Sequence, residues 1–567
     1  MFKETDPGRP VDLFGDVENL LEWNKKKLKK YRDEKRWHNQ FRRRVYEVID
    51  EKPYGVLFDS RMGAPNAPVK QLLSMMIIKE LFRWSDSQLY EQFEFNVLVR
   101  RAIGIDTLTE EIPVPSTYYL FRKRLYEHSK EAGEDLLEKT FSQVTEEQVR
   151  EFRVDGRRIR MDSKLLGSNI AWYSRYELVH KSFQMFYRSL TKRDKRFIQT
   201  RYRTEINNML GEEAEKVVYR RNRDEVNQRL HRLGELLHLV IGQYEGKKDE
   251  SFKQLERVFE NQYEISEGEK VLLRPKEKIP PDSVQSPHDP DCTYRGKSGS
   301  QVKGYHANIT ETCGDDLHLI TDVRIEAASC GEANFYKEAV EGSEAVTGQK
   351  VEYVHADGAY YSESNSLYSE KKNIDLVVTG IKGSEPKYII RQTTEGYVAA
   401  DRESGTVYEM HTAKKNKNSW ETRYYIRTES GRTYFSERAI YTALQREKLL
   451  SRPKSELRIR NNVEATIGHF AYGLLNNKTP YRRKQKQQMW AYCRAMAVNM
   501  KRIEGYVRSK WPFEAQKAVI RHHNDLENTL NTLTISLNFL KCPYLSNILN
   551  YFNSKSQNYS IIPGLAF

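Results

Sequence analysis

The sequence has few of the features that mark secreted, membrane-spanning or zinc-stabilised proteins. Its five cysteines are widely spread with no CxxC pair, and nothing near His288 and Cys292 completes a set of four metal ligands. Neither a disulfide framework nor a structural zinc site is indicated. The longest apolar stretches, such as residues 72–81, are interrupted well before the ~20 residues that cross a bilayer. The first ten residues lack the apolar core of a signal peptide. We therefore expect a cytoplasmic protein with no membrane partner.

Positive charge is the most informative feature of the composition. The 567 residues include 93 Lys and Arg against 79 Asp and Glu, a formal net charge of +14, which favours a polyanionic partner. Charge alone leaves open a merely basic soluble protein, but the charge is clustered. Residues 24–45 hold eleven Lys or Arg with Tyr31, Trp37 and Phe41 among them, and residues 478–486 hold five basic side chains and no acid. Such clusters suit backbone contacts and base stacking, so both segments are predicted to contact nucleic acid.

The first 150 residues have the periodicity of helices. Apolar residues recur at helical spacing over residues 70–81, and Ser85 is placed to cap a second helix that runs to about residue 98. Ser116 is expected to cap a third helix over residues 117–128, with three basic residues exposed on it: Arg122, Lys123 and Arg124. Short helices that end in a basic one suggest a helix-turn-helix DNA-binding arrangement, and a plain helical bundle is the alternative.

From about residue 151 the pattern changes to alternating strands and helices. A turn at Asp155-Gly156 leads into an extended run over residues 159–162, and a polar helical region over residues 177–263 is predicted to form an inserted hairpin. Five prolines make residues 275–290 a loop. The following elements are predicted in order: a strand hairpin at 303–310 and 317–325, a helix at 332–346, a strand at 351–356, a helix at 364–372, a strand at 374–379, and a small β insertion at 397–435.

This order predicts an α/β fold with the ribonuclease H-like arrangement, a mixed sheet flanked by helices. We expect a helical DNA-binding domain at residues 1–150 and the catalytic domain at 151–510. The catalytic domain carries a helical and linker insertion at about 175–290 and a β insertion at 385–436. A helical tail occupies residues 511–567 and carries no recognisable motif.

Three acidic residues are candidates for a metal site in this fold. Asp162 is expected at the end of the first strand and Asp357 at the end of the fourth, with Glu464 on a later helix. Carboxylates that converge in this way suit Mg²⁺, which prefers oxygen ligands and substrate phosphates. Most acids at strand ends are solvated or cap a turn, and Asp155, beside Gly156, competes with Asp162 for the first position. Spacing therefore suggests the site without proving it.

Five stretches resemble the DDE transposases of bacterial insertion sequences. The first-aspartate segment is similar to residues 160–179, with Asp162-Ser163 and the tail Arg175, Glu177, Leu178 and Val179. The second-aspartate strand, Ala-Asp-x-x-Tyr, is matched by Ala356, Asp357 and Tyr360, and the glutamate helix by Arg460 and Glu464, four residues apart. Residues 63–105 resemble the helical amino-terminal domain of this InsH-like group, and residues 288–309 resemble the segment that enters the second strand.

The resemblance implies an enzyme with a defined site and partners. Asp162, Asp357 and Glu464 would be the catalytic residues and would hold two Mg²⁺ (or Mn²⁺) ions for cleavage and strand transfer. The partners implied are the terminal inverted repeats and target DNA, both double-stranded, bound by a nucleoid-associated homodimer. Related families often carry a Lys seven residues after the glutamate and a Tyr seven before it, where this chain has Ala471 and Leu457. The predicted DNA contacts are therefore Arg460, Lys478, Arg482 and Arg483, with the basic residues of the third helix.

Two alternatives share the fold. One is a transposase-derived DNA-binding protein without a working catalytic centre. The absence of the Lys seven residues after Glu464 favours this alternative. The other is a nuclease that cuts without strand transfer. A protein–protein adaptor would leave the basic clusters without a purpose.

Overall fold

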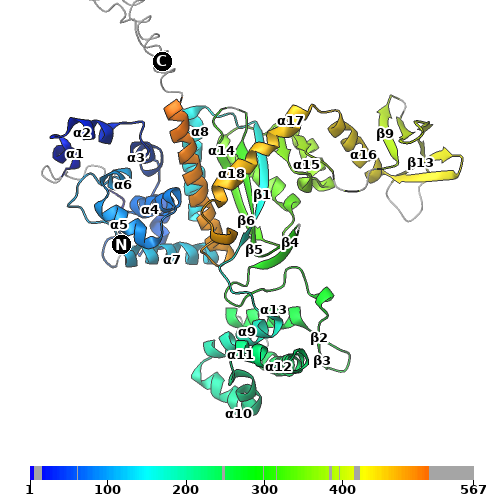
Figure 1. The fold of residues 1–567 in the computed structure, drawn as a ribbon, viewed down its shortest axis with the longest axis horizontal. Coiled ribbons are helices and arrows are strands. Elements are labelled where there is room, and N and C mark those ends of the chain that lie inside the picture. The colour runs from blue at the N-terminus through cyan, green and yellow to red at the C-terminus, as the bar shows by residue number, and fades with distance from the viewer. Residues whose placement is uncertain are drawn as a thin grey trace, which may run out of the picture. The chain divides into compact units, whose positions relative to one another are not determined.

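The computed structural model describes residues 1–5, 16–59, 62–244, 249–297, 299–314, 316–381, 383, 386–394, 396–413 and 422–509. Residues 1–502 form one compact unit, to which the following description applies. The predicted tail at 511–567 lies outside the described residues. The chain is a mixed α/β protein (Figure 1). None of its described helices is long and apolar enough to cross a bilayer.

Helices make up the amino-terminal part. Its elements are α1 (Val17–Leu21), α2 (Lys25–Arg32), α3 (Trp37–Phe41), η1 (Arg42–Tyr46), η2 (Lys52–Leu57), α4 (Val69–Phe82), α5 (Asp86–Phe95), α6 (Val97–Ala102), α7 (Pro115–Ala132) and α8 (Leu136–Phe152). The predicted helix at 70–81 is confirmed, and Ser85 caps α5 in a capping box with Gln88. The prediction that Ser116 caps α7 is wrong. The helix begins two residues earlier than predicted, at Pro115, whose fixed φ suits the first helical position, and Val114 is the N-cap.

A mixed sheet lies at the centre of the unit. Its strands are β1 (Arg158–Gly167), β4 (Thr293–Lys297), β5 (Ser300–Thr312), β6 (Ile320–Ala327), β7 (Tyr353–Ala356) and β8 (Asp375–Val378). The order is β4-β5-β1-β7-β8. Strand β6 pairs with the later part of β5, on the same side of β5 as β4. The β1–β5 pair is antiparallel, whereas β1–β7 and β7–β8 are parallel. The predicted hairpin is confirmed as β5 and β6, and the two later strands as β7 and β8.

Helices pack on both faces of this sheet. On one face α14 (Tyr336–Thr347), which follows η4 (Glu332–Phe335), shares a core with Ile159, Met161 and Val354. A second core joins strands β5 and β6 to the amino-terminal helices and to the helix that begins at residue 484. In this core Phe141 of α8 stacks on Tyr492 at 5.6 Å. The amino-terminal helices and the sheet therefore share one apolar interior.

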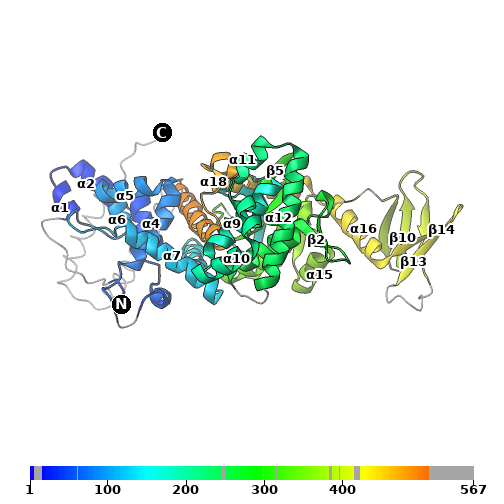
Figure 2. The ribbon, with the colours of Figure 1, turned by 90° about the horizontal axis from the view of Figure 1, so that it is seen from below.

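The helical insertion lies where it was predicted but has more helices than a hairpin. Instead of a hairpin it has five helices: α9 (Arg175–Ser189), α10 (Lys192–Leu210), α11 (Ala214–Arg220), α12 (Arg223–Tyr244) and α13 (Glu250–Gln262). They gather in one group (Figures 1 and 2), followed by β2 (Tyr263–Ile265), β3 (Val271–Leu273) and η3 (Lys276–Lys278). The helices enclose an apolar core of their own, which includes Phe183, Leu233 and Phe259. A two-helix hairpin could not bury the apolar stripes of all these segments, so the chain closes into a bundle.

The predicted β insertion is present between β8 and α16 (Figure 2). It has two three-stranded antiparallel sheets, made of β9 (Tyr388–Thr393), β10 (Gly396–Asp401) and β11 (Val407–Glu409), and of β12 (His411–Thr412), β13 (Arg423–Thr428) and β14 (Gly431–Ser436). After the β insertion the chain returns to the sheet through a series of helical elements. These elements are α16 (Glu437–Leu450), α17 (Lys454–Arg458), η6 (Ile459–Asn462), α18 (Val463–Ala471) and η7 (Leu475–Asn477); α15 (Glu363–Lys372) and η5 (Gly358–Tyr360) precede β8.

Candidate active site and nucleic-acid interface

Asp162 lies in the middle of β1, not at its end as predicted. The strand continues to Gly167 because β5 remains paired with it along the whole length, Asp162 opposite Ile309. The parallel pairing of β1 with β7, however, stops at Arg160. Asp162 thus lies two residues beyond the last residue of β1 that pairs with β7, and its side chain is buried.

Asp357 directly follows β7, as predicted. Its Oδ1 accepts hydrogen bonds from the Gly358 amide at 2.6 Å and from Thr379 Oγ1 at 3.0 Å, which fix the carboxylate at the start of η5. Since β1 and β7 are parallel neighbours, their carboxyl ends point to the same edge of the sheet, where Asp162 also lies. The two aspartates are close enough that the charge of Asp357 acts on the pKa of Asp162.

Glu464 lies in the first turn of α18, and its side chain is 64% exposed. One guanidinium joins it to Asp162. Nη1 of Arg460 donates to Glu464 Oε1 at 2.9 Å, and Nη2 donates to Asp162 Oδ2 at 2.5 Å. The two carboxylates are thus separated only by the width of a guanidinium and two hydrogen bonds. The expectation that Arg460 and Glu464 share one helix is wrong, because Arg460 lies in η6 and Glu464 begins the next helix, α18.

The electrostatics of Asp162 reflect this crowding. Burial raises the pKa of Asp162 above its usual value, and the negative charges of Asp357 and Glu332 add to the effect. The Arg460 charge and the hydrogen bond from the Ser163 amide act in the opposite direction. A second cation at this place would favour the ionised form further.

The three carboxylates supply the oxygen ligands that Mg²⁺ prefers. Among the described residues, however, no three such side chains are gathered closely enough to hold an ion as they stand, and Arg460 holds oxygens of two of them. The donor set fits a divalent cation in its chemistry, and a bound cation would compete with Arg460 for these oxygens. Asp155 is not a competitor for the site, because its carboxylate accepts from the amide and guanidinium of Arg157 in the turn.

A buried glutamate that the sequence did not reveal anchors the helix of Glu464. Glu311 of β5 is fully buried and accepts from Arg160 Nε at 2.6 Å, Arg502 Nη1 at 2.6 Å and Thr466 Oγ1 at 2.7 Å. Burial opposes its ionisation, but the charges of Arg502 and Arg160 outweigh burial and lower the pKa of Glu311. Because Thr466 belongs to α18, this network fixes the glutamate helix to the sheet.

The other residues of the resembling motifs have structural contacts. Ser163 shares a hydrogen bond with His306 at 2.8 Å, and the Tyr360 hydroxyl donates to Asn308 at 2.6 Å, so both are held by β5. Glu177 forms a capping box with Ser174 at the start of α9. Arg175 donates to Gln262 Oε1 at 2.8 Å. The tail of the first motif thus builds the helical insertion.

A cavity of about 570 Å³ adjoins Asp162 through its neighbour Ser163. No acid is among its described lining residues, which include three lysines and an exposed tryptophan: Lys164, Lys303, Lys478 and Trp172. Lys478 forms an isolated parallel bridge with Gly167 at the end of β1, and a Cβ at Gly167 would lie 2.9 Å from Cγ of Lys478. Two successive residues in the left-handed region, Asn476 and Asn477, precede Lys478. Of the candidates after Glu464, Lys478 is the one that reaches this cavity.

Arg482 and Arg483 lie elsewhere. Arg482 Nε donates to the Asn169 carbonyl at 2.6 Å, and Arg483 pairs with Glu250 at 3.1 Å. Both line a second cavity together with Arg122 and Lys123 of α7. The two predicted DNA-contact sets, far apart in sequence, are therefore neighbours in the fold.

The prediction that the basic residues of α7 are all exposed is wrong for two of them. Arg122 is 21% exposed, 3.6 Å from Asp86, and lies 5.3 Å from the rings of both Tyr118 and Tyr481. Arg124 is half-buried over Phe58. Lys123 is exposed, as expected. The helix packs against the segment after residue 478 and against η2, which covers these two arginines.

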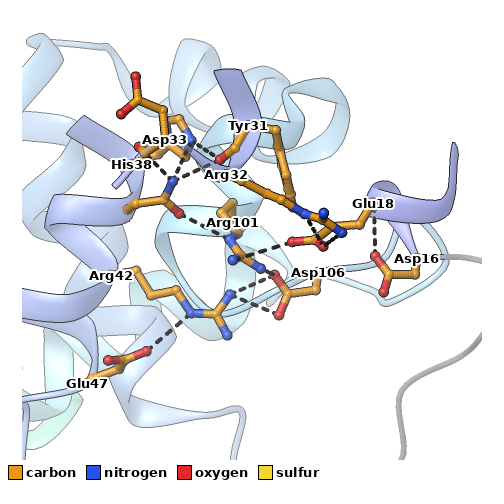
Figure 3. A network of polar contacts seen from close by, with 11 residues as sticks. Asp16, Glu18, Tyr31, Arg32, Asp33, His38, Arg42, Glu47, Arg101 and Asp106 are labelled. Atoms are coloured by element: carbon orange, nitrogen blue, oxygen red, sulfur yellow. Dashed lines mark hydrogen bonds and ion pairs between the residues drawn. The ribbon is translucent and has the colours of Figure 1, made fainter. Parts of the chain in front are cut away.

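The basic segment at 24–45 is also partly internal. Tyr31 and Phe41 are buried and cannot stack on bases, contrary to the prediction. Arg42 of this segment and Arg101 of α6 both bind Asp106 at 2.6 Å, which ties the segment to α6 (Figure 3). Other side chains of this part remain exposed. Trp23 is 97% exposed, and five exposed lysines have no ion pair among the described residues: Lys25, Lys26, Lys27, Lys29 and Lys30.

The molecule is thus a mixed α/β protein with an acidic site at a sheet edge, a lysine-lined cavity beside it and a basic helical part. Residues 29–124, which span most of the amino-terminal helices, match the family model of a transposase domain (DUF772). This match supports a transposase family. Searches of curated proteins and of solved structures gave no significant match.

Proposed function

We propose that the chain is a DNA transposase of the DDE kind, with a ribonuclease H-like catalytic domain and Asp162, Asp357 and Glu464 as its catalytic residues. The observation that carries the proposal is that one guanidinium, that of Arg460, binds both Asp162 and Glu464, while the charge of Asp357 acts on Asp162. Asp162 and Glu464, which are far apart in sequence, thus share one partner near the point where β7 ends beside β1. The transposase-domain match supports the class independently of this geometry.

The side chains around this site have distinct roles in the proposed reaction. Two Mg²⁺ or Mn²⁺ ions held by the three carboxylates would activate the attacking oxygen and stabilise the leaving oxygen. Lys164, Lys303 and Lys478 bind phosphate oxygens of the strand that enters beside Asp162. Glu311 holds α18, and with it Glu464, in register with β1. Arg460, which binds Asp162 and Glu464 here, would be free to bind a DNA phosphate if cations occupied these carboxylates.

The DNA partners follow from the exposed positive charge. The lysines of α2 and Lys123 of α7 contact the backbone of the terminal inverted repeats, with Trp23 beside them. After cleavage, target DNA binds at the same edge of the sheet, beside Asp162 and Asp357. Because two ends must be held together for transposition, the working assembly is a homodimer on DNA.

The decisive experiment uses the Asp357→Asn variant. With Mg²⁺ and DNA that carries the element's ends, the wild type should nick the ends and join them to target DNA, whereas the variant should bind the ends without nicking them. Retained nicking by the variant would refute the assignment of Asp357.

The same assay separates the alternatives. The contacts of Arg460 with two carboxylates are what a transposase-derived DNA-binding protein without a working centre would also have. Such a protein predicts shifted bands and no nicking by the wild type, while a nuclease predicts nicking without joined products.

A further inference from the structure

A cavity of about 700 Å³ lies between helices α4, α5 and α7 and the segment 480–493. None of the three candidate catalytic residues lines it. Its volume is within the ~300–1,000 Å³ of small-molecule sites, so it is too small for a DNA duplex. A single nucleotide or a ligand of similar size fits.

Positive charge exceeds negative charge in this cavity. Two acids line it, against six basic side chains: Lys79, Arg122, Lys123, Arg482, Arg483 and Lys486. Glu80 is already bound by Trp490 Nε1 at 2.9 Å and by Arg494 at 3.3 Å. Asp86 is shared between Lys79 and Arg122. Both acids of the cavity are thus engaged. Lys123 and Arg483 pair with Glu127 and Glu250, which do not line the cavity, so among the described residues Arg482 and Lys486 are left without an acidic partner.

Lys486 is the clearest of the uncompensated groups. It has no ion pair among the described residues, and its ammonium lies 4.5 Å from the ring centre of Tyr126. Burial and the charges of Arg483 and Arg122 lower the pKa of Lys486. An anion in the cavity would relieve this repulsion. Arg482 is a second donor at the same rim, bonded to a backbone carbonyl and not to an acid.

Aromatic rings line another part of the wall. Tyr118 is buried, Tyr119 is 48% exposed, and Tyr481 lies beside the Arg122 guanidinium. Aromatic rings and guanidinium planes are the surfaces on which proteins stack unpaired bases. Phosphate-binding cations next to exposed rings, in a space of this size, are the chemistry of a nucleotide site.

We propose that this cavity binds a single phosphorylated nucleotide, its phosphate on Lys486 and Arg482 and its base against Tyr119. Two sources share this chemistry: an unpaired nucleotide of a DNA strand, and a free nucleotide. The first source rests on the proposed function, and the second does not.

The test measures binding in EDTA, so that no cleavage is needed. The probes are a duplex with one unpaired 5′-phosphorylated 2-aminopurine nucleotide, a fully paired duplex of equal length, and free AMP as competitor. The wild type should bind the unpaired probe, or AMP, at least about tenfold more tightly than Lys486→Met does, since a charge-assisted hydrogen bond to phosphate is lost. Lys484→Met is the matched control: Lys484 is on the same helix but pairs with Glu326 and does not line the cavity.

Each outcome decides the proposal. Competition by AMP assigns the free nucleotide, and preference for the unpaired over the paired duplex without such competition assigns the strand. Tyr119→Ala should then remove the change in 2-aminopurine fluorescence. Equal binding of both duplexes with no AMP binding, or equal losses in the two lysine variants, overturns the proposal. The Asp357→Asn variant should bind these probes normally, so failure of the catalytic proposal leaves this one standing and the reverse also holds.

Discussion

Replacing Glu311 by Gln tests whether this buried residue positions Glu464, the proposed catalytic glutamate. The substitution keeps the shape but removes the charge that faces Arg160 and Arg502 and leaves one acceptor where there were two. Breaking a buried ion pair by removing one partner costs about 3–5 kcal/mol. Because the amide retains one acceptor, the lower end, about 3 kcal/mol, is expected.

The effect on catalysis should be larger than the effect on DNA binding. Thr466 loses its charged acceptor, so α18 is less firmly held on the sheet, and a displacement of about 1 Å at Glu464 is enough for a loss of about 10²-fold. Cleavage in Mg²⁺ should therefore fall by about two orders of magnitude, while binding of end DNA, measured by gel shift, changes little.

The stability difference should depend on pH. The pKa of Glu311 is lowered in the folded protein, so its contribution is present above the pKa of the unfolded carboxyl, about 4.3. The contribution is lost as pH falls through the lower folded value. Chemical denaturation should show the largest difference between wild type and Glu311→Gln at neutral pH and a smaller one in acid.

Glu326→Gln on the neighbouring strand is the control for this series. Its pair with Lys484 is partly exposed, so the change should cost no more than about 1 kcal/mol and leave cleavage intact. Equal effects of the two variants on stability and cleavage would refute the role of Glu311.

Three further predictions concern the site itself. Asp162→Asn should abolish cleavage yet leave the metal-free protein at least as stable as the wild type at pH 7, because the raised pKa means that ionisation of Asp162 is disfavoured by folding; a clear fall in the denaturation midpoint would contradict this. Mg²⁺ or Mn²⁺ at 100 times its Kd should stabilise the wild type by about 2.7 kcal/mol, and chelation should reverse the effect, whereas Asp162→Asn should show no such shift. Lys478→Met should lower the rate of cleavage about tenfold or more with little change in end binding, and Gly167→Ala, which displaces Lys478, should act in the same direction; unchanged rates in both variants would remove Lys478 from the strand path.

Much of the fold was predictable from the sequence because it depends on local patterns. The spacing of apolar residues predicted α4, and Ser85 as a capping residue predicted the start of α5. Patterns typical of strands predicted β5, β6 and β7, the strand before Asp357. These features depend on residues a few positions apart. The start of α7 was missed by two residues, because a Pro at the first helical position and a Ser at the cap are both acceptable start signals and lie next to each other here.

The errors fall where burial depends on distant segments. Tyr31 packs under Arg101 and Arg122 packs on Tyr481, and nothing near Tyr31 or Arg122 in the sequence indicates these distant partners. The helical insertion was taken for a hairpin because each stripe seen alone permits one. Only closure of five helices buries all the stripes at once.

The sequence by itself determined the identities of the acidic candidates and the elements that carry Asp357 and Glu464. Tertiary structure alone decided that Arg460 joins Asp162 to Glu464, that Glu311 fixes α18, and that two basic segments line one cavity. The physical reason is that side-chain chemistry and periodicity are local properties. The distance between two charges, and the water that remains around them, are set by the whole packed chain.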